Sequence, residues 1–143
     1  MLRLARSRVS IKRGDLFSIP LGTGEDGRDF YRPVLVVQND IGNRYCNSVI
    51  VVPLSYKLRA KNLFFGVLVK STPQTGLIHD AVAVLSHIRT VEKSYFSNDN
   101  YLGKVDRQTM EKIDQGLALS LGLSTLQKLQ DRYYSRLESS HHG

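Results

Sequence analysis

The sequence predicts an α+β protein, mainly β, in which a small, strongly curved antiparallel sheet precedes one long helix near the C-terminus. Two observations favour this fold class. The first two thirds of the chain contain short apolar runs rich in β-branched residues and separated by turn-forming residues, a pattern typical of strands. In the last third, apolar residues recur at three- and four-residue steps, which indicates a helix. The 143 residues, 41% of them hydrophobic, suit one compact domain over residues 1–143.

The first predicted strand spans residues 15–21, where polar and apolar side chains alternate as in a half-buried strand. Pro20 has no backbone N–H to donate, which places it at a sheet edge or a strand end. The next segment, residues 21–31, contains three glycines and three acids, so we expect a mobile loop with no regular element.

Two runs at residues 34–38 and 48–54 are almost continuously apolar, as expected of strands buried on both faces. Residues 39–47 connect them and contain Asn-Asp and Gly-Asn pairs, which predicts an antiparallel hairpin with a longer loop. Further strands are predicted at residues 63–69, 81–85 and, after a bend, 87–91.

The long helix is predicted from one apolar stripe, which consists of Met110, Ile113, Leu117 and Leu121. Asp106 is the candidate N-cap of this helix, and Gly122 suits the left-handed position that ends it.

Residues 124–143 predict an additional helical extension. Ser124 and Gln127 form a candidate capping box. The extension carries a second apolar stripe, which consists of Leu126, Leu129, Tyr133 and Leu137. At the other end of the chain, residues 1–10 form a basic tail with three arginines and no acid, which we interpret as a solvated terminus.

Charge and cysteine content narrow the range of partners and compartments. The net charge of +7 and the pI near 9.7 favour a polyanionic partner such as nucleic acid, because Lys and Arg release counterions from phosphates. Cys46 is the only cysteine, so no internal disulfide can form and the cytoplasm is the expected compartment. No apolar run approaches the ~20 residues that span a bilayer, so we expect no membrane association.

Common metal and nucleotide motifs are missing from the sequence. The 13 acids include no Asp-x-Asp pair, and the spacing of the four histidines does not suit a zinc site. The Gly22-Thr23-Gly24 run lacks the Lys-Ser/Thr ending of a phosphate-binding P-loop. We therefore expect neither a metal nor another cofactor, which disfavours a two-metal nuclease.

Four segments, in order, resemble one known family. They are KRGD at residues 12–15, RPVLVVQNDIGN at 32–43, IRT at 88–90 and IDQGLALSLGL at 113–123. Together they span about residues 11–123, and they are similar to the MazF/PemK (Kid) ribonuclease toxins of type II toxin–antitoxin pairs. The resemblance implies an SH3-like barrel shared by MazF, Kid and CcdB, a homodimer and a MazE-like antitoxin partner. It also implies sequence-specific, ribosome- and metal-independent cleavage of single-stranded RNA, leaving 2′,3′-cyclic phosphate and 5′-OH ends.

Three residues are predicted to be catalytic on the basis of this resemblance. Arg32 occupies the position of the family's catalytic arginine, and its planar guanidinium can contact two phosphate oxygens at once. Ser55 occupies the position of a family threonine that contacts the scissile phosphate, and it keeps the hydroxyl. Glu25 matches the family's loop acid, although two extra residues separate it from Arg32 in this chain. Each residue also has a structural interpretation, as a surface arginine, a turn-capping serine and a solvated loop acid.

Four further residues are candidate RNA contacts. Phe17 and Tyr31 are candidate stacking surfaces, and Lys57 belongs to a basic stretch that can meet phosphates. His87 stands where relatives typically carry glutamine, and it is a candidate base or a stacking ring, or else a histidine satisfied by hydrogen bonds. We expect the loops at residues 21–31 and 54–62 to set the recognised RNA sequence.

Two other functions remain open at the level of sequence. A non-catalytic toxin of the same fold can bind gyrase, as CcdB does, and a catalytically silent domain can bind nucleic acid. Arg32 and Ser55 favour the nuclease, because a protein-binding toxin has no need of phosphate chemistry.

Overall fold

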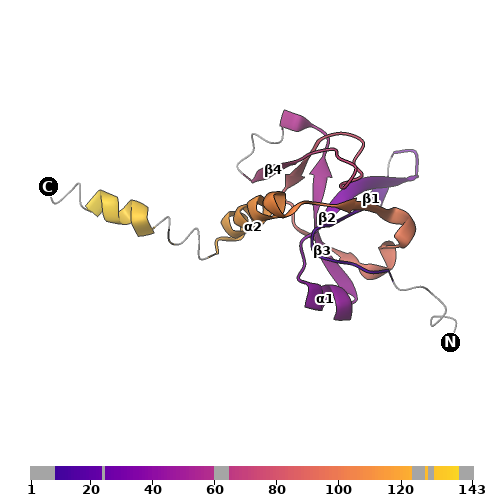
Figure 1. Ribbon diagram of the computed structural model, residues 1–143, viewed down its shortest axis with the longest axis horizontal. Helices are drawn as coiled ribbons and strands as arrows, with labels where there is room; N and C mark the ends of the chain where they lie inside the picture. The colour runs from indigo at the N-terminus through magenta and orange to yellow at the C-terminus, as the bar shows by residue number, and fades with distance from the viewer. Residues whose placement is uncertain (1–8, 24, 60–64, 124–127, 129–130, 139–143) are drawn as a thin grey trace.

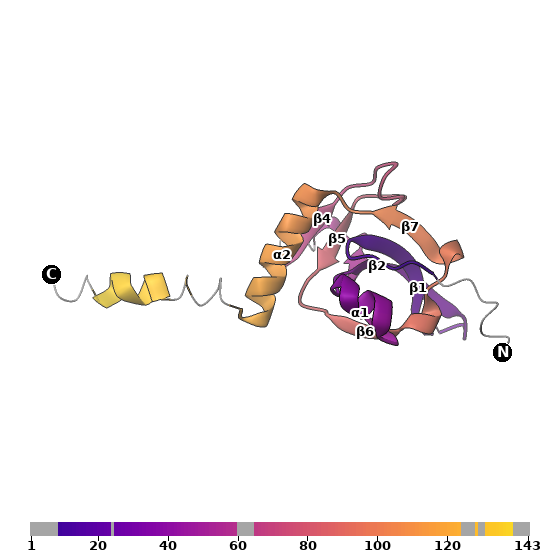
Figure 2. The same cartoon turned by 60° about the horizontal axis from the view of Figure 1, so that its bottom comes forward.

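An antiparallel sheet that curls on itself forms the body of the protein, as the computed structural model shows (Figures 1 and 2). The structure describes residues 9–23, 25–59, 65–123, 128 and 131–138. Within them, the strands are β1 (Asp15–Thr23), β2 (Asp29–Val36), β3 (Ser48–Ser55), β4 (Gly66–Val69), β5 (Ala81–Val84), β6 (Arg89–Glu92) and β7 (Tyr101–Lys104). The helices are α1 (Asp40–Tyr45), α2 (Arg107–Leu121) and the 3-10 turns η3 (Lys93–Tyr95) and η4 (Asn98–Asn100).

The curvature of the sheet originates at β3. The strand order is β4-β5-β3-β2-β1-β7, with β6 as an additional partner of β3. One edge of β3 pairs with β2, whereas the other edge pairs first with β6 and then, at its end, with β5. Because two strands share one edge of β3, the sheet divides there and wraps around, with α2 on one side and α1 near one open end (Figure 2).

Strands β1 to β3 contribute side chains to two apolar cores, one on each face. The first core includes Leu16, Leu35 and Val52, and the second includes Phe17 and Val34. Neighbouring residues on a strand point to opposite faces, so burial on both faces requires an almost continuous apolar run. The prediction for residues 34–38 and 48–54 is therefore confirmed for most side chains, but Ile50 of β3 is 37% exposed. The half-buried interpretation of residues 15–21 is wrong, because Leu16, Phe17 and Ile19 are each 0% exposed.

Helix α2 covers the first core, as the apolar stripe predicted. Ile113 and Leu117 are buried in that core and Met110 packs against it, but Leu121 is 58% exposed. Asp106 is the N-cap, with its carboxylate accepting a hydrogen bond from the backbone N–H of Thr109. Gly122 ends the helix in the left-handed conformation, at φ 68°.

The hairpin between β1 and β2 corrects the prediction of an irregular loop at residues 21–31. β1 continues to Thr23 and β2 begins at Asp29, and these two residues are paired. An irregularity in register between Pro20 and Thr23 accommodates the glycine-rich sequence. Backbone pairing depends little on side-chain type, so composition alone did not reveal this extension. Pro20 lies where β1 pairs with β2, beyond the segment paired with β7.

Two further elements were not predicted. Helix α1 interrupts the predicted loop at residues 39–47, because Asn39 caps it by accepting a hydrogen bond from the N–H of Gly42. The strand β7 has the sequence YLGK and carries little apolar signal, but it pairs with β1.

The other predicted strands are found with shifted ends. β4, β5 and β6 correspond to the runs predicted at residues 63–69, 81–85 and 87–91. Residues 60–64, the tail at 1–8 and the predicted capping pair Ser124 and Gln127 lie outside the described residues, as do Leu126 and Leu129.

Residues 131–138 are helical, in agreement with a helical C-terminal extension (Figure 1). Two members of its predicted stripe, Tyr133 and Leu137, are 61% and 39% exposed. No helix within the described residues is both long enough and apolar enough to cross a bilayer.

Candidate active site

Arg32 lies near the exposed beginning of β2, where the strand leaves the barrel. Its Cα is paired with Ile19 of β1, and its side chain is half-buried. Among the residues that the structure describes, no hydrogen bond or ion pair engages the guanidinium. Its five N–H donors therefore remain available to an anion.

Arg32 and Ser55 both lie two residues beyond the paired segment of β2 and β3. The assigned pairs run from Val36 with Val51 to Val34 with Pro53. The pairing ends there, and continuing the same register by two residues would bring Arg32 opposite Ser55. Both side chains continue the face of the second core, because a strand returns to the same face every second residue. Both residues therefore lie just beyond the same end of the β2–β3 pair.

The hydroxyl of Ser55 is held by the turn that follows β3. The backbone N–H of Lys57 donates to Ser55 Oγ over 3.2 Å, so the structural interpretation of this serine as a turn cap is correct. A hydroxyl that accepts one hydrogen bond still has its own proton to donate. The cap fixes Ser55 without consuming the group that a phosphate contact needs.

Glu25 is exposed at the tip of the β1–β2 hairpin, beyond the last pair of Thr23 with Asp29. Asp29 itself is three residues from Arg32 along β2, which corresponds to about 10 Å of strand. The structure therefore does not bring Glu25 together with Arg32 and Ser55.

The two predicted stacking residues differ in outcome. Phe17 is 0% exposed, and its ring makes edge-to-face contacts with Phe96 and Tyr101 at centroid distances of 5.1 and 5.4 Å. A ring buried in the second core has no face to offer to RNA, so the proposed RNA contact of Phe17 is wrong. Tyr31 is 56% exposed, but strand alternation places it on the face of β2 opposite Arg32.

The basic and imidazole candidates are both exposed. Lys57 follows Ser55 directly after the bend at Tyr56, and Arg59 is also exposed. His87 lies between β5 and β6, where its backbone N–H donates to the carbonyl of Val84 over 3.1 Å. Its imidazole is therefore at the surface and not in a core.

The structure also reveals aromatic residues that the sequence prediction passed over. Phe30 is 56% exposed and lies two residues before Arg32 on the same strand. Tyr56 meets the ring of His79 edge to face at 5.9 Å, and burial raises the pKa of the Tyr56 hydroxyl. Phe30 could have been identified from the sequence by counting two residues back from Arg32 along the strand. The contact between Tyr56 and His79 could not, because it joins two loops that are far apart in the sequence.

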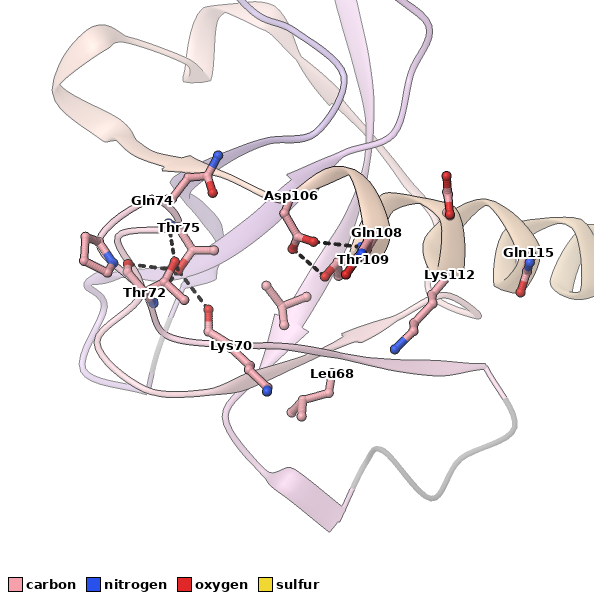
Figure 3. A pocket seen from close by; sticks show the side chains of 13 residues that line it. Leu68, Lys70, Thr72, Gln74, Thr75, Asp106, Gln108, Thr109, Lys112 and Gln115 are labelled. Carbon is pink, nitrogen blue, oxygen red and sulfur yellow. Dashed lines mark hydrogen bonds between the residues drawn. The ribbon is translucent and has the colours of Figure 1, made fainter.

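A cavity of about 990 Å³ lies between β4, the loop after it and the first half of α2 (Figure 3). Lys70 and Lys112 contribute positive charge to its lining, and Asp106 and Glu111 contribute negative charge. Its lining includes none of the predicted site residues. Another cavity, of about 310 Å³, lies between the end of β1 and β6 and is lined in part by Leu21 and Arg89.

No group of three or more His, Cys, Asp or Glu residues within the described part of the chain is arranged to hold a metal ion.

The fold is thus a small curved antiparallel sheet, and Arg32 and Ser55 at the end of the β2–β3 pair offer it a cation and a hydroxyl that can contact a phosphate group. Residues 12–121 match the family described as PemK-like, MazF-like toxin of type II toxin–antitoxin system. The chain belongs to this family.

Individual relatives agree with this assignment. Endoribonuclease EndoA of Bacillus subtilis (strain 168) is 33% identical over 117 residues, which cover 79% of this chain and 96% of that protein. A solved endoribonuclease in complex with its cognate antitoxin, from Mycobacterial species, is 29% identical with a TM-score of 0.58, and the match covers 80% of this chain and 95% of that one.

The MazE–MazF structure (Form II) from Deinococcus radiodurans is 20% identical with a TM-score of 0.64, and the match covers 81% of this chain and 99% of that one. At this identity the likeness concerns the fold alone. It confirms the predicted class, a MazF-like barrel of mainly antiparallel strands with few helices.

Proposed function

We propose that this protein is the toxin of a type II toxin–antitoxin pair and acts as a sequence-specific endoribonuclease on single-stranded RNA. The proposal is carried by the position of Arg32 and Ser55 just beyond the same end of the β2–β3 pair, in a member of the MazF-like family, with no partner on the Arg32 guanidinium among the described residues. The reaction requires neither a ribosome nor a metal ion. The ribose 2′-OH attacks the adjacent phosphate and the 5′-oxygen leaves, giving a 2′,3′-cyclic phosphate and a 5′-OH.

Arg32 stabilises the negative charge that grows on the phosphate as the pentavalent phosphorane forms. A guanidinium is a poor acid or base, since its pKa lies above ~12, so charge stabilisation is the role its chemistry favours. The planar fork suits two equatorial oxygens at once. Its half-buried position also reduces the screening of this interaction by water.

Ser55 donates its hydroxyl proton to a phosphate oxygen while its oxygen accepts the N–H of Lys57. A preorganised donor of this kind acts mainly on charge that develops in the transition state. The proton from the 2′-OH goes to a general base, and the leaving 5′-oxygen takes a proton from an acid. Glu25 and His87 remain the candidate proton carriers, and Glu25 requires movement of the hairpin tip to reach the phosphate.

RNA binding extends from Arg32 along the surface. Lys57 contributes positive charge, and Tyr31 and His87 offer exposed rings near the loops that we expect to read the sequence. Single-stranded RNA is the substrate because unpaired bases can enter such sites.

We also propose a homodimer and a MazE-like antitoxin as protein partners, acting in the cytoplasm. The solved relative in complex with its cognate antitoxin and the net charge of +7, which suits an acidic antitoxin segment, support the antitoxin. Exposed apolar side chains such as Leu58, Leu121 and Leu123 favour burial against another subunit. Residues 1–143 form one domain in this proposal, with residues 124–143 as an extension beyond the catalytic barrel.

The decisive experiment incubates the purified protein with a long unstructured RNA in excess EDTA and maps the product ends. Wild-type protein is expected to give discrete cuts with 2′,3′-cyclic phosphate ends, and Arg32→Ala is expected to give none. Arg107→Ala is the matched control, since Arg107 is an arginine of α2 with a side chain 93% exposed. Intact RNA with wild-type protein would contradict the nuclease and favour the gyrase-binding alternative, whereas cleavage by Arg32→Ala would contradict the site.

A further inference from the structure

Strand β2 presents different aromatic rings on its two faces. Val34 and Val36 belong to the second core, whereas Leu35 belongs to the first. Following the same alternation towards the start of the strand, Arg32 and Phe30 continue the face of the second core. Tyr31 continues the opposite face. Phe30 is thus the aromatic residue that shares a face with Arg32.

The ring of Phe30 is exposed, and its backbone lies between two paired residues, opposite the irregularity in β1. The neighbours Asp29 and Tyr31 are paired across the hairpin with Thr23 and Pro20, so Phe30 lies within the paired part of the strand. Its side chain is 56% exposed, and no aromatic contact engages it among the residues that the structure describes. Leaving a Phe side chain in water forgoes about 1.5–3 kcal/mol of burial, which a ligand can recover.

The spacing of Phe30 and Arg32 suits one nucleotide. Residues two apart on a strand are about 7 Å apart. A phosphate on the Arg32 guanidinium therefore leaves the attached nucleotide within reach of the Phe30 ring. Stacking on an aromatic face accepts any base, because every base has a π-face.

We propose that Phe30 is a substrate-binding residue on which a base next to the cleaved phosphate stacks. This inference rests on the proposed ribonuclease function and extends it by naming a contact on the Arg32 face. The exposed ring increases affinity for the RNA and holds the phosphate against Arg32. It contributes little to the choice of sequence, because stacking involves no hydrogen-bond readout.

The test uses a short single-stranded RNA that contains a cut site mapped with the wild-type protein. Phe30→Ala is expected to lower kcat/KM by about 5- to 150-fold, which corresponds to ~1–3 kcal/mol for one stacked base. The loss should appear mainly in KM, and Phe30→Trp should restore activity to within about threefold. Tyr45→Ala is the control, because Tyr45 is an aromatic residue of α1 that is 73% exposed and has no place in the proposed site, and it should change kcat/KM less than about threefold.

A second readout separates binding from chemistry. Fluorescence anisotropy with the same RNA carrying a 2′-deoxy sugar at the cut site measures affinity without cleavage, and Phe30→Ala should raise Kd by the same factor as KM. Unchanged Kd and kcat/KM in Phe30→Ala would overturn the inference. So would a Phe30→Ala variant that dissociates into monomers, which would assign the ring to a subunit interface.

The inference and the proposed function fail in different ways. If wild-type protein cleaves RNA and Phe30→Ala does so equally well, only the stacking contact is wrong. If wild-type protein neither cleaves nor binds any single-stranded RNA, the function is wrong and the role of Phe30 falls with it.

Discussion

The backbone N–H of Lys57 donates a hydrogen bond to the hydroxyl oxygen of Ser55, 3.2 Å away, at the end of β3. This bond orients the serine side chain before any substrate arrives. A donor that is already oriented requires no reorganisation during the reaction, which is the condition under which a single hydrogen bond to a developing charge has a large effect.

Ser55 variants test this role. Ser55→Thr keeps the hydroxyl and is expected to retain kcat/KM within about threefold, whereas Ser55→Ala should lower kcat by about 10- to 100-fold because one transition-state donor is lost. Single-turnover cleavage of the mapped RNA site by the three proteins measures the effect. Equal rates for all three would remove Ser55 from the mechanism.

The parts of the fold that were predicted are those with a strong local signal. Helix α2 follows from the repeat of Ile113 and Leu117 and from Asp106 and Gly122 at its ends, each of which acts within a few residues. The buried strands follow from continuous apolar runs. β7 has no such pattern in its sequence, because backbone pairing with the distant strand β1 stabilises it. α1 was not predicted because only one residue, its N-cap Asn39, marks its start.

The residues of the candidate site also differ in whether the sequence alone could predict them. Arg32 and Ser55 could be predicted one at a time from the family resemblance, but their position at the same end of the β2–β3 pair depends on the register of two strands and on no spacing within the chain. Phe17 was wrongly predicted to contact RNA because the alternation of side chains along a strand does not reveal whether its second face is exposed to solvent or buried. Here Phe96 and the second core cover it.

Arg13 connects three parts of the fold. Its Nε donates to the carbonyl of Val37 over 2.8 Å, and its Nη2 lies 2.7 Å from a carboxylate oxygen of Asp114 on α2. Arg13→Ala is expected to lower the free energy of unfolding by about 2 kcal/mol, because a charged donor to a carbonyl is lost with the ion pair. Asp114→Ala should lower it by less than about 1 kcal/mol, as it breaks only a solvent-exposed pair. Urea unfolding of both variants measures the difference, and equal losses would show that the Val37 contact contributes nothing.

Gly76 allows two backbone segments to touch. Its φ is 67°, and an added Cβ would collide with the carbonyl oxygen of Leu102 in β7. Gly76→Ala is therefore expected to lower the free energy of unfolding by about 2–4 kcal/mol, through both the left-handed backbone and the collision. Gly27→Ala is the matched control, because Gly27 has φ 79° but open space around its Cα, and it should lose only about 1 kcal/mol. Similar losses in urea unfolding would indicate that the loop shifts away from β7 at little cost.

The N-cap Asp106 should make the free energy of unfolding fall at acidic pH, because its carboxylate stabilises the start of α2 in the charged form. The side chain of Thr109 donates to its carboxylate over 2.6 Å, and this bond, with the N–H of the same residue, lowers the pKa of Asp106 below the usual 3.8. Because the folded-state pKa is the lower one, the stabilisation is present above the unfolded-state pKa near 3.8 and is lost as pH falls through the folded-state value.

Asp106→Ala should lower the free energy of unfolding by about 1 kcal/mol at pH 7, as for other N-caps. Asp106→Asn keeps an acceptor but not the charge, so its difference from wild type should shrink as pH falls below about 4. Glu111→Gln is the control, since Glu111 is an exposed carboxylate one turn later with only a 3.9 Å ion pair to Arg107. An Asp106→Asn difference that stays constant between pH 7 and pH 3 would show that the charge of Asp106 does not contribute to the cap.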